Sequence, residues 1–406
     1  MGFQLPHGRP HHLHGGEPLK ASITSVDVAG KRVLVREDLN VPLKDGQVAD
    51  ATRIKAAVPT LKDLQSRGAM VIVMSHLGRP KGVDQSLSLR PVAQELGRAL
   101  WTEVKFAYDC VGPQAQSAVS RLQPGSVLML ENVRFHPEDE ANDPAFAQQL
   151  ASLGEIFCND AFASSHRVHA SVVGVAQYLP AYAGRLMEAE LNALHAALDY
   201  PKKPLIAVIG GAKVSTKIGL LNNLAQTVDA LIIGGAMANT FLKAQGHNTG
   251  NSLIDDTAIE PANQIWKTMG QRLVLPVDLM ATQQTMSGQP LRVFPASNVE
   301  DGWIAVDIGP QTISLFAKHL QGAGTIVWNG PLGITEVPEF SAGTKAVGEA
   351  IATSGAYTLV GGGDTAAAVD ALGLAGRFSF VSTGGGATLE YLEGKELPGV
   401  AVLKEA

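Results

Sequence analysis

Residues 357–364 read YTLVGGGD, a short apolar run that passes directly into three glycines and a carboxylate. Apolar runs that do not alternate with polar residues are typical of strands buried on both faces of a sheet. Between such runs lie helical patterns, as in residues 88–101. The same apolar form recurs in KRVLVRED (31–38), AMVIVMSH (69–76), SVLMLENVRF (126–135), EIFCNDAF (155–162), PLIAVIGG (204–211), DALIIGGAM (229–237), GTIVWNGP (324–331) and FSFVSTGGG (378–386).

This alternation predicts an α/β fold with two doubly wound parallel sheets, each in a Rossmann-like domain. A helix is predicted between them over residues 184–204, because Met187, Leu191, Leu194 and Leu198 recur at spacings of four, three and four. The prolines that follow end this helix. We therefore expect a first domain over 21–185, an interdomain helix and hinge over 186–203, a second domain over 204–390, and a C-terminal segment over 391–406 that packs back on the first domain.

Composition narrows the function classes. The chain has 406 residues, a net charge of −6 and only 17% charged residues, which argues against binding nucleic acid or an anionic membrane. No apolar run reaches the roughly 18 residues of a membrane-spanning helix, and no signal-peptide core is present. Cys110 and Cys158 lie in no CxxC motif, so a reducing cytoplasm is expected. The histidine-rich residues 1–20 show no periodicity and are predicted to be a disordered extension.

Polar and cationic residues follow the strands of the first half, where an open α/β sheet binds its ligand. One such residue alone is most often structural, but several cations at one sheet rim would repel one another without a polyanion. Arginine can donate two N–H groups to a phosphate or a carboxylate, and the Asp and Asn suit a ligand hydroxyl. The group predicts a site for a small hydroxylated, phosphorylated carboxylic acid, made by Asp38, Asn40, Arg53, His76, Arg79, Arg134, Arg167 and His169.

Glycine loops follow the strands of the second half and lead toward helices. One Gly-Gly turn is weak evidence, but five in one domain indicate close approach to a phosphorylated ligand at helix N-termini. The chain has neither a P-loop motif nor a GxGxxG motif that opens a helix, so a nucleotide is expected and a dinucleotide oxidoreductase is disfavoured. The loops are GGAKVSTKIG (210–219), GGAMANTF (234–241), NGPLG (329–333), GGGDTAAA (361–368) and STGGGA (382–387).

Three charged residues of these loops suit a nucleotide phosphate and its metal. Lys213 and Lys217 are four residues apart, so on a helix they would share a face and reach one phosphate group. Asp364 at a helix start could be an ordinary cap. Beside phosphates it would add repulsion unless a hard cation lies between them, and Mg²⁺ favours one or two carboxylates together with phosphate oxygens.

Ten motifs, read in order, resemble those of the phosphoglycerate kinase family across residues 30–403. They are REDLNVP, ATRI, SHLGRPKG, LENVRF, NDAFASSHRVHAS, GGAKVSTKI, GGAMANTFL, WNGPLG, VGGGDTAAA and STGGGATLEYLEGKELPGV. The resemblance implies a hinged, usually monomeric, cytoplasmic enzyme of glycolysis and gluconeogenesis. Its reaction would convert 1,3-bisphosphoglycerate and MgADP reversibly into 3-phosphoglycerate and MgATP.

The resemblance also implies roles for residues of this chain. It implies that the cationic and polar group of the first half binds 3-phosphoglycerate, and that Asp364 binds Mg²⁺. Arg53 and Lys213 would face the transferred phosphoryl group, with Lys217 and the amides around Gly385 assisting. The nucleotide is assigned to Lys213, Lys217, Gly235, Asn329, Glu336, Gly361, Gly362, Gly363, Asp364 and Thr365.

Four residues depart from the family pattern: Glu37, Ala163, Thr216 and Asn239, which stand where valine, glycine, aspartate and phenylalanine are usual. Two alternatives to an active kinase are open. One is a nucleotide-binding scaffold of the same fold that has lost catalysis through these changes. The other is an α/β dehydrogenase, which the missing dinucleotide motif disfavours.

Overall fold

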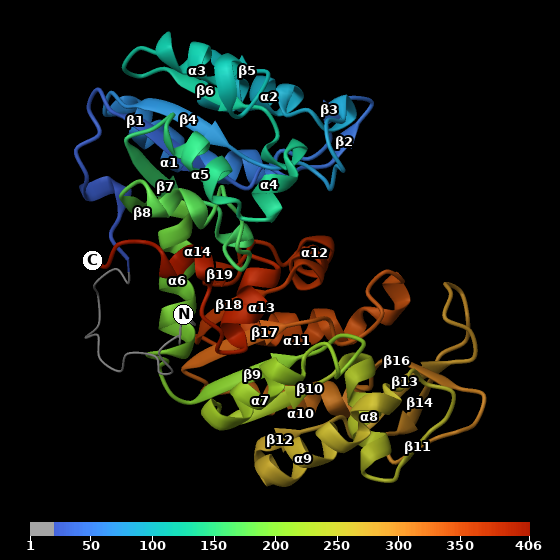
Figure 1. Ribbon diagram of the computed structural model, residues 1–406. Helices are drawn as coiled ribbons and strands as arrows, with labels where there is room; N and C mark the ends of the chain where they lie inside the picture. Colours follow the sequence, from blue (N-terminus) through green and yellow to red (C-terminus); the bar gives the residue numbers. More distant parts are fainter. Residues whose placement is uncertain (1–19) are drawn as a thin grey trace.

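The computed structural model describes residues 20–406, so the predicted extension lies outside the described residues except for Lys20. Two six-stranded sheets, in which every neighbouring pair of strands is parallel, form the frame of the molecule (Figure 1). The first sheet has the order β5-β6-β4-β1-β7-β8. Its strands are β1 (Arg32–Arg36), β4 (Met70–Met74), β5 (Val104–Ala107), β6 (Val127–Leu130), β7 (Ile156–Asn159) and β8 (Ala181–Ala183).

The second sheet has the order β12-β10-β9-β17-β18-β19, again all parallel. The predicted α/β fold with two doubly wound parallel sheets is confirmed. All nine apolar runs of the sequence contain strands, whereas β5, β8 and β12 were not predicted. The strands are β9 (Leu205–Ile209), β10 (Ala230–Ile233), β12 (Leu273–Val274), β17 (Thr325–Asn329), β18 (Tyr357–Gly361) and β19 (Phe380–Val381).

Helices cover both faces of each sheet, which explains why the strands lack alternation. In β1, Val33 and Val35 belong to one core cluster with α1 and α2, while Leu34 belongs to another on the opposite face. The first half contains α1 (Thr52–Ser66), α2 (Arg90–Leu100), α3 (Gly112–Ser120), α4 (Pro137–Glu140) and α5 (Pro144–Ala151). The second contains α7 (Ile218–Thr227), α8 (Gly235–Ala244), α9 (Ile259–Met269), α10 (Pro310–Leu320), α11 (Ala342–Ala352), α12 (Gly363–Ala371) and α13 (Gly386–Leu392).

A single helix, α6 (Arg185–Leu198), runs between the two sheets (Figure 1), so the helix predicted from the apolar spacing is confirmed. Its first turn is bound to the first half, where the backbone N–H of Leu186 donates to Asp160 at 2.9 Å. One turn later, the Glu190 carboxylate accepts hydrogen bonds from Ser382 Oγ at 2.6 Å and from the Thr383 N–H at 2.8 Å, in the second half. Consecutive turns of α6 therefore bind different halves of the molecule.

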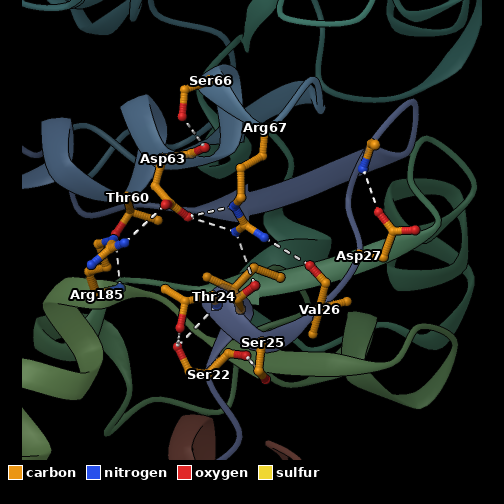
Figure 2. A network of polar contacts seen from close by, with 12 residues as sticks. Ser22, Thr24, Ser25, Val26, Asp27, Thr60, Asp63, Ser66, Arg67 and Arg185 are labelled. Carbon is orange, nitrogen blue, oxygen red and sulfur yellow. Dashed lines mark hydrogen bonds and ion pairs between the residues drawn. The ribbon is translucent and has the colours of Figure 1, made fainter.

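A polar network fixes the start of α6 and the segment before β1 to helix α1 (Figure 2). Arg67 donates to the Asp63 carboxylate at 2.6 Å and to the carbonyl of Val26 at 2.8 Å. Arg185 donates to the other oxygen of Asp63 at 2.9 Å, and its backbone N–H donates to Thr60 Oγ1 at 3.0 Å. Asp63 thus joins both arginines.

The C-terminal segment lies against the first sheet. The Lys404 N–H donates to the carbonyl of Ala181 in β8, and the carbonyl of Lys404 accepts from the Ala21 N–H, both at 2.9 Å. In the short helix α14 (Pro398–Ala401), the Gly399 N–H donates to Ser165 at 2.8 Å.

A three-stranded antiparallel sheet in the second half was not predicted. It contains β13 (Asp278–Thr282), β14 (Arg292–Pro295) and β16 (Ile304–Ile308), with β13 in the centre. A two-stranded pair, β11 (Asn248–Thr249) and β15 (Asn298–Val299), lies in the same part of the chain, and a hairpin of β2 (Leu43–Lys44) and β3 (Gln47–Val48) follows β1. The strand β16 matters for function because its residues form a wall of the cleft described below.

Candidate functional site

A buried arginine that the sequence reasoning missed lies at the centre of the first half's site. Arg36 ends β1 and is completely buried. It lies 3.1 Å from His76 Nδ1 and donates to Ser171 Oγ at 3.0 Å. A lone cation at the end of the apolar run VLVR was the available signal. Arg36, rather than Arg53, is thus the cation that the first strand itself supplies.

Arg53 lies instead in the first turn of α1, where it forms an ion pair with Asp38. The second oxygen of Asp38 accepts a hydrogen bond from Ser164 at 3.1 Å. Burial acts to raise the pKa of Asp38, but the nearby guanidinium groups of Arg53 and Arg36 counteract it, and the pKa is lowered to about 2. Asp38 is therefore an anion that orients Arg53.

The loop after β4 is held by two other members of the predicted group. Asn40 accepts the Gly78 N–H at 2.9 Å, and Arg134 donates to the Gly78 carbonyl at 2.8 Å. Arg134 is buried and its Nε lies 3.3 Å from a Glu140 carboxylate oxygen without forming a hydrogen bond. A buried N–H without an acceptor is available to a ligand.

The remaining predicted residues differ in exposure. Arg79 is exposed, and Arg167 is partly buried and donates to His166 Nε2 at 3.3 Å. His169 is buried, with Nδ1 at 3.7 Å from Asp139. Burial lowers the pKa of His76 well below its usual range, and Arg36 lowers it further. His76 is consequently a neutral hydrogen-bonding group rather than a cation.

Like charges meet in this group. Burial lowers the pKa of Arg134, and the nearby Arg167 and Arg36 contribute to the same shift. Burial likewise lowers the pKa of Arg36, against the opposing effect of Asp139 and Asp38. The pKa shifts thus show that the positive charges of Arg36, Arg134 and Arg167 lie close enough to repel one another. An anionic ligand would neutralise this repulsion.

Glu37, the departure in the first strand motif, has a partner. Glu37 Oε1 and Asp160 Oδ2 are buried oxygens that no N–H or O–H donor of the described residues reaches. Burial raises the pKa of Glu37 well above its usual range, and the neighbouring Asp160 raises it further. A proton shared between the two carboxyls satisfies both oxygens. Since Asp160 also accepts from the start of α6, this pair lies where that helix joins the first half.

In the second half, a cleft of about 610 Å³ opens at the ends of the parallel strands. Gly235, Glu336 and Asp364 of the predicted nucleotide site line it. Asn239 also lines the cleft and donates to the Leu253 carbonyl at 3.3 Å, so the departure there puts a polar group in the wall. Gly235 has a φ of +67°, and a Cβ there would lie 2.8 Å from the Gly211 backbone, so only glycine fits.

Lys213 and Lys217 do not share a helical face, because the segment that carries them is not helical. Helix α7 begins only at Ile218, and the residues before it form turns closed by Thr216 Oγ1, which donates to the Lys213 carbonyl at 2.9 Å. Lys213 is exposed, whereas Lys217 donates to the Gly210 carbonyl at 2.8 Å. Burial lowers the pKa of Lys217 to about 8, although Asp364 acts to raise it. The four-residue spacing of the two lysines is not a helical spacing here, because the glycine loop extends through Lys217 to the start of α7.

The glycines before α12 are held by buried polar groups. Asn329 donates to the Gly361 carbonyl at 2.8 Å, and its side-chain oxygen has no hydrogen-bond partner among the described residues. Thr365 accepts the Gly330 N–H at 2.7 Å. Gly362 has a φ of +98° and Gly363 is exposed at the helix start. Backbone N–H groups of this turn are therefore open to a phosphate. The loop 329–333 does not lead directly into a helix, as the other four glycine loops do, because the next α-helix, α11, begins only at Ala342.

Asp364 lies in the first turn of α12, exposed toward the cleft. One accessible carboxylate suits Mg²⁺, which keeps water and substrate phosphate oxygens as its other ligands. Asp307, a residue that the sequence reasoning missed, also lines the cleft. Burial raises the pKa of Asp307 to about 7, although its oxygens accept the N–H groups of Gly343 and Ile308 at 2.7 and 2.8 Å.

The two half-sites meet at one loop pair. A Cβ at Gly384 would lie 2.4 Å from the Phe162 ring, and one at Gly386 would lie 3.2 Å from His166 Nε2. Gly385 has a φ of +51° and precedes α13 directly. The loop of Arg167 in the first half thus touches the glycine loop that begins α13.

A rim of cations suited to a phosphorylated acid, opposite a glycine-lined cleft suited to a nucleotide, defines a kinase of small molecules. The family profile described as phosphoglycerate kinase matches residues 23–395. The chain therefore belongs to the phosphoglycerate kinase family, whose reaction is a phosphoryl transfer of glycolysis.

Individual relatives agree with this assignment. The phosphoglycerate kinase of Moorella thermoacetica is 52% identical over 390 residues, 95% of this chain and 99% of that protein. That of Chloroflexus aggregans is 51% identical over 397 residues, covering 95% and 99%. The solved phosphoglycerate kinase of Coxiella burnetii superposes with a TM-score of 0.89 at 43% identity, covering 94% of this chain and 98% of that one. The Pyrococcus horikoshii structure gives 0.82 at 31% identity with the same coverage.

Within residues 20–406, no helix combines the length and the apolar character needed to cross a membrane.

Proposed function

We propose that this chain transfers a phosphoryl group reversibly between 1,3-bisphosphoglycerate and MgADP, with 3-phosphoglycerate and MgATP as products. One observation carries the proposal: the loop bearing His166 and Arg167 touches the glycine loop 384–386, so the cationic half-site adjoins the second half at a helix N-terminus. A scaffold that only bound nucleotide would not need the cationic half.

In this assignment the acid binds to the rim of the first half. Arg36 joins the predicted group as a buried cation that positions His76 and adds to the positive potential. Arg53, which pairs with Asp38, has a side chain that is 40% exposed and so is accessible to the acid. The other proposed ligands of 3-phosphoglycerate are Asn40, Arg79, Arg134, Arg167 and His169.

The nucleotide binds in the cleft of the second half. Lys213 and Lys217 meet its phosphates together with the N–H groups of the turn before α12. Asp364 would hold Mg²⁺, which neutralises phosphate charge when bound. Asn329, Thr365 and the glycines 361–363 shape the phosphate turn, and Gly235 and Glu336 line the nucleotide pocket.

Transfer then needs positioning and charge neutralisation rather than a covalent intermediate. Arg53, Lys213 and the amides around Gly385 surround the position of the transferred group, and Lys217 supports the loop beneath it. Reacting atoms must approach to about 3–3.5 Å. We therefore propose that the halves, joined by α6, close together and exclude water when both substrates are bound.

We further propose that the enzyme works as a monomer in the cytoplasm. Its two cysteines are free and buried, which suits a reducing compartment. Small-angle scattering tests the closure. The radius of gyration should fall clearly only with 3-phosphoglycerate and a magnesium nucleotide together, and an unchanged value in that mixture would refute closure.

Turnover is the direct test of the proposed function. Purified protein should consume 3-phosphoglycerate and MgATP in an assay coupled to NADH oxidation. Calorimetric binding of both ligands without turnover would favour the scaffold alternative, and the proposed reaction would then be wrong.

A further inference from the structure

Three side chains with different metal-binding chemistry meet outside the proposed substrate sites. They are Asp109, Cys110 and His136, and one ligand atom of each lies within 4.8 Å of the other two. Asp109 and Cys110 follow β5, and His136 comes six residues after β6. Because β5 and β6 are paired in parallel, their carboxyl ends bring these residues to the same edge of the sheet.

The three residues already form an ordered group. His136 Nε2 lies 2.7 Å from Asp109 Oδ1, the same oxygen that accepts the Cys110 N–H at 2.7 Å. The His136 ring lies against Phe146, with 5.2 Å between the ring centroids. The side chains of His136 and Asp109 are 31% and 40% exposed, whereas Cys110 is fully buried beneath them. A cation could enter from solvent and meet the sulfur at the bottom of the group.

We propose that Asp109, Cys110 and His136 bind a divalent cation of the Zn²⁺ class, with a fourth position left for water. Sulfur, imidazole nitrogen and carboxylate oxygen are the ligands that Zn²⁺ uses, at about 2.3, 2.0 and 2.1 Å. Tetrahedral ligands at those lengths are about 3.4 to 3.7 Å apart, so atoms within 4.8 Å reach this geometry by movements of about 1 Å. The hydrogen bond between Asp109 and His136 opens as the cation enters. Mg²⁺ and Ca²⁺, which favour oxygen ligands, do not suit a thiol.

Protons and charge set the conditions for binding. Burial raises the pKa of the Cys110 thiol well above its usual range, and the nearby Asp109 and Asp139 raise it further. Coordination replaces the thiol proton, which passes to solvent, and the sulfur binds as a thiolate. The acidic neighbours that oppose ionisation of the thiol also attract a dication, as does Glu131.

Co²⁺ is the probe for this site, because a cobalt–thiolate bond gives a charge-transfer band in the near ultraviolet. The full chain has only two cysteines, so the band reports on Cys110 or Cys158 alone, and the histidines of residues 1–20 cannot produce it. We expect the band in the reduced wild-type protein at about one equivalent of Co²⁺ and its loss when Zn²⁺ is added. Absence of the band at saturating Co²⁺ would overturn the proposal.

Matched variants identify the ligands. Cys110→Ala should abolish the band, whereas Cys158→Ala, the buried cysteine of β7, should retain it. His136→Asn changes a partly exposed side chain and should fold normally, which circular dichroism checks; it should weaken Co²⁺ binding at least tenfold. Asp109→Asn should weaken binding as well. A band that survives Cys110→Ala, or a His136→Asn protein with wild-type affinity, would refute the site.

Discussion

The two half-sites of this kinase differ in which groups hold their charged side chains in place. In the first half, the anion-binding groups are side chains held by other side chains, such as Arg53 by Asp38 and Arg36 by His76 and Ser171. In the second half, the charged groups Lys213 and Asp364 are exposed, and the side chains of Lys217, Asn329 and Thr365 bind the backbone of the glycine loops. A rigid acid site thus faces a nucleotide site whose charged side chains are free to adapt. The expected effects of substitutions differ accordingly.

Lys213→Ala should have the largest effect. An exposed lysine that binds the ground state little, but meets charge as the phosphoryl group transfers, acts mainly on turnover. Loss of one such charge lowers kcat by roughly 10²–10³-fold. Steady-state kinetics should show this with KM for 3-phosphoglycerate nearly unchanged, and Lys243→Ala on α8 serves as a lysine control. An unchanged kcat would remove Lys213 from the transfer step.

Arg134→Ala should act on the opposite half and on binding. Losing a charge-assisted hydrogen bond costs about 1.5–3 kcal/mol, which is roughly a 10- to 150-fold rise in KM for 3-phosphoglycerate. MgATP binding should stay within about twofold. Because Arg134 also holds the Gly78 carbonyl, Arg134→Lys separates charge from geometry. If Arg134→Ala weakened both substrates equally, the division between the halves would be wrong.

Asp364→Asn should weaken MgADP by roughly tenfold or more, about 1.4 kcal/mol, and metal-free ADP by much less. The carboxylate is a Mg²⁺ ligand in the proposed site, and a neutral amide binds this ion poorly. Calorimetry with and without Mg²⁺ measures the difference. A carboxylate that only caps α12 would lose equal affinity in both conditions, and that outcome would refute the metal role.

Alkaline pH should separate the two anion sites. The pKa of Lys217 is lowered to about 8, so its ammonium loses the proton as pH rises through that value. Affinity for free ADP should fall about tenfold between pH 7 and 9, whereas the arginines of the first half remain charged. Lys217→Arg should remove this pH dependence. A flat pH profile in the wild-type protein would show that Lys217 does not bind the phosphates.

Glu37→Gln should have the smallest effect, on stability alone. The folded pKa of Glu37 is raised above its usual value of 4.5, so the folded state keeps a proton that the unfolded state loses. The wild-type free energy of unfolding therefore declines as pH rises above about 4.5, toward the folded pKa. The amide cannot ionise and still donates to Asp160, so urea unfolding should show a weaker decline, by about 1 kcal/mol between pH 5 and 7. Parallel pH profiles would refute the shared proton.

The sequence predicted the parallel sheets because strands buried on both faces leave an unmistakable pattern. It also drew attention to His76 and Arg134, since these follow the apolar runs of β4 and β6. It did not predict β13, β14 and β16, whose short antiparallel strands are partly exposed and carry no long apolar run. Asp307 was missed for this reason, although it lines the cleft. The spacing of Lys213 and Lys217 allowed a shared helical face, but spacing alone cannot show where a glycine loop ends, and α7 begins only at Ile218.

The contact of the C-terminal segment with the first sheet has a consequence for synthesis. The first half cannot complete its edge at β8 until residues 399–404 have left the ribosome, because Lys404 binds Ala181 and Ala21. Nascent chains usually fold one domain at a time from the N-terminus. Here the first half, which is synthesised first, lacks part of its structure until residues 399–404 are synthesised. The Lys20 side chain also donates to the Leu403 carbonyl, 383 residues away in the sequence. A ribosome-bound chain lacking this segment would leave the Ala181 carbonyl of β8 without this partner, and unpaired strand edges favour aggregation.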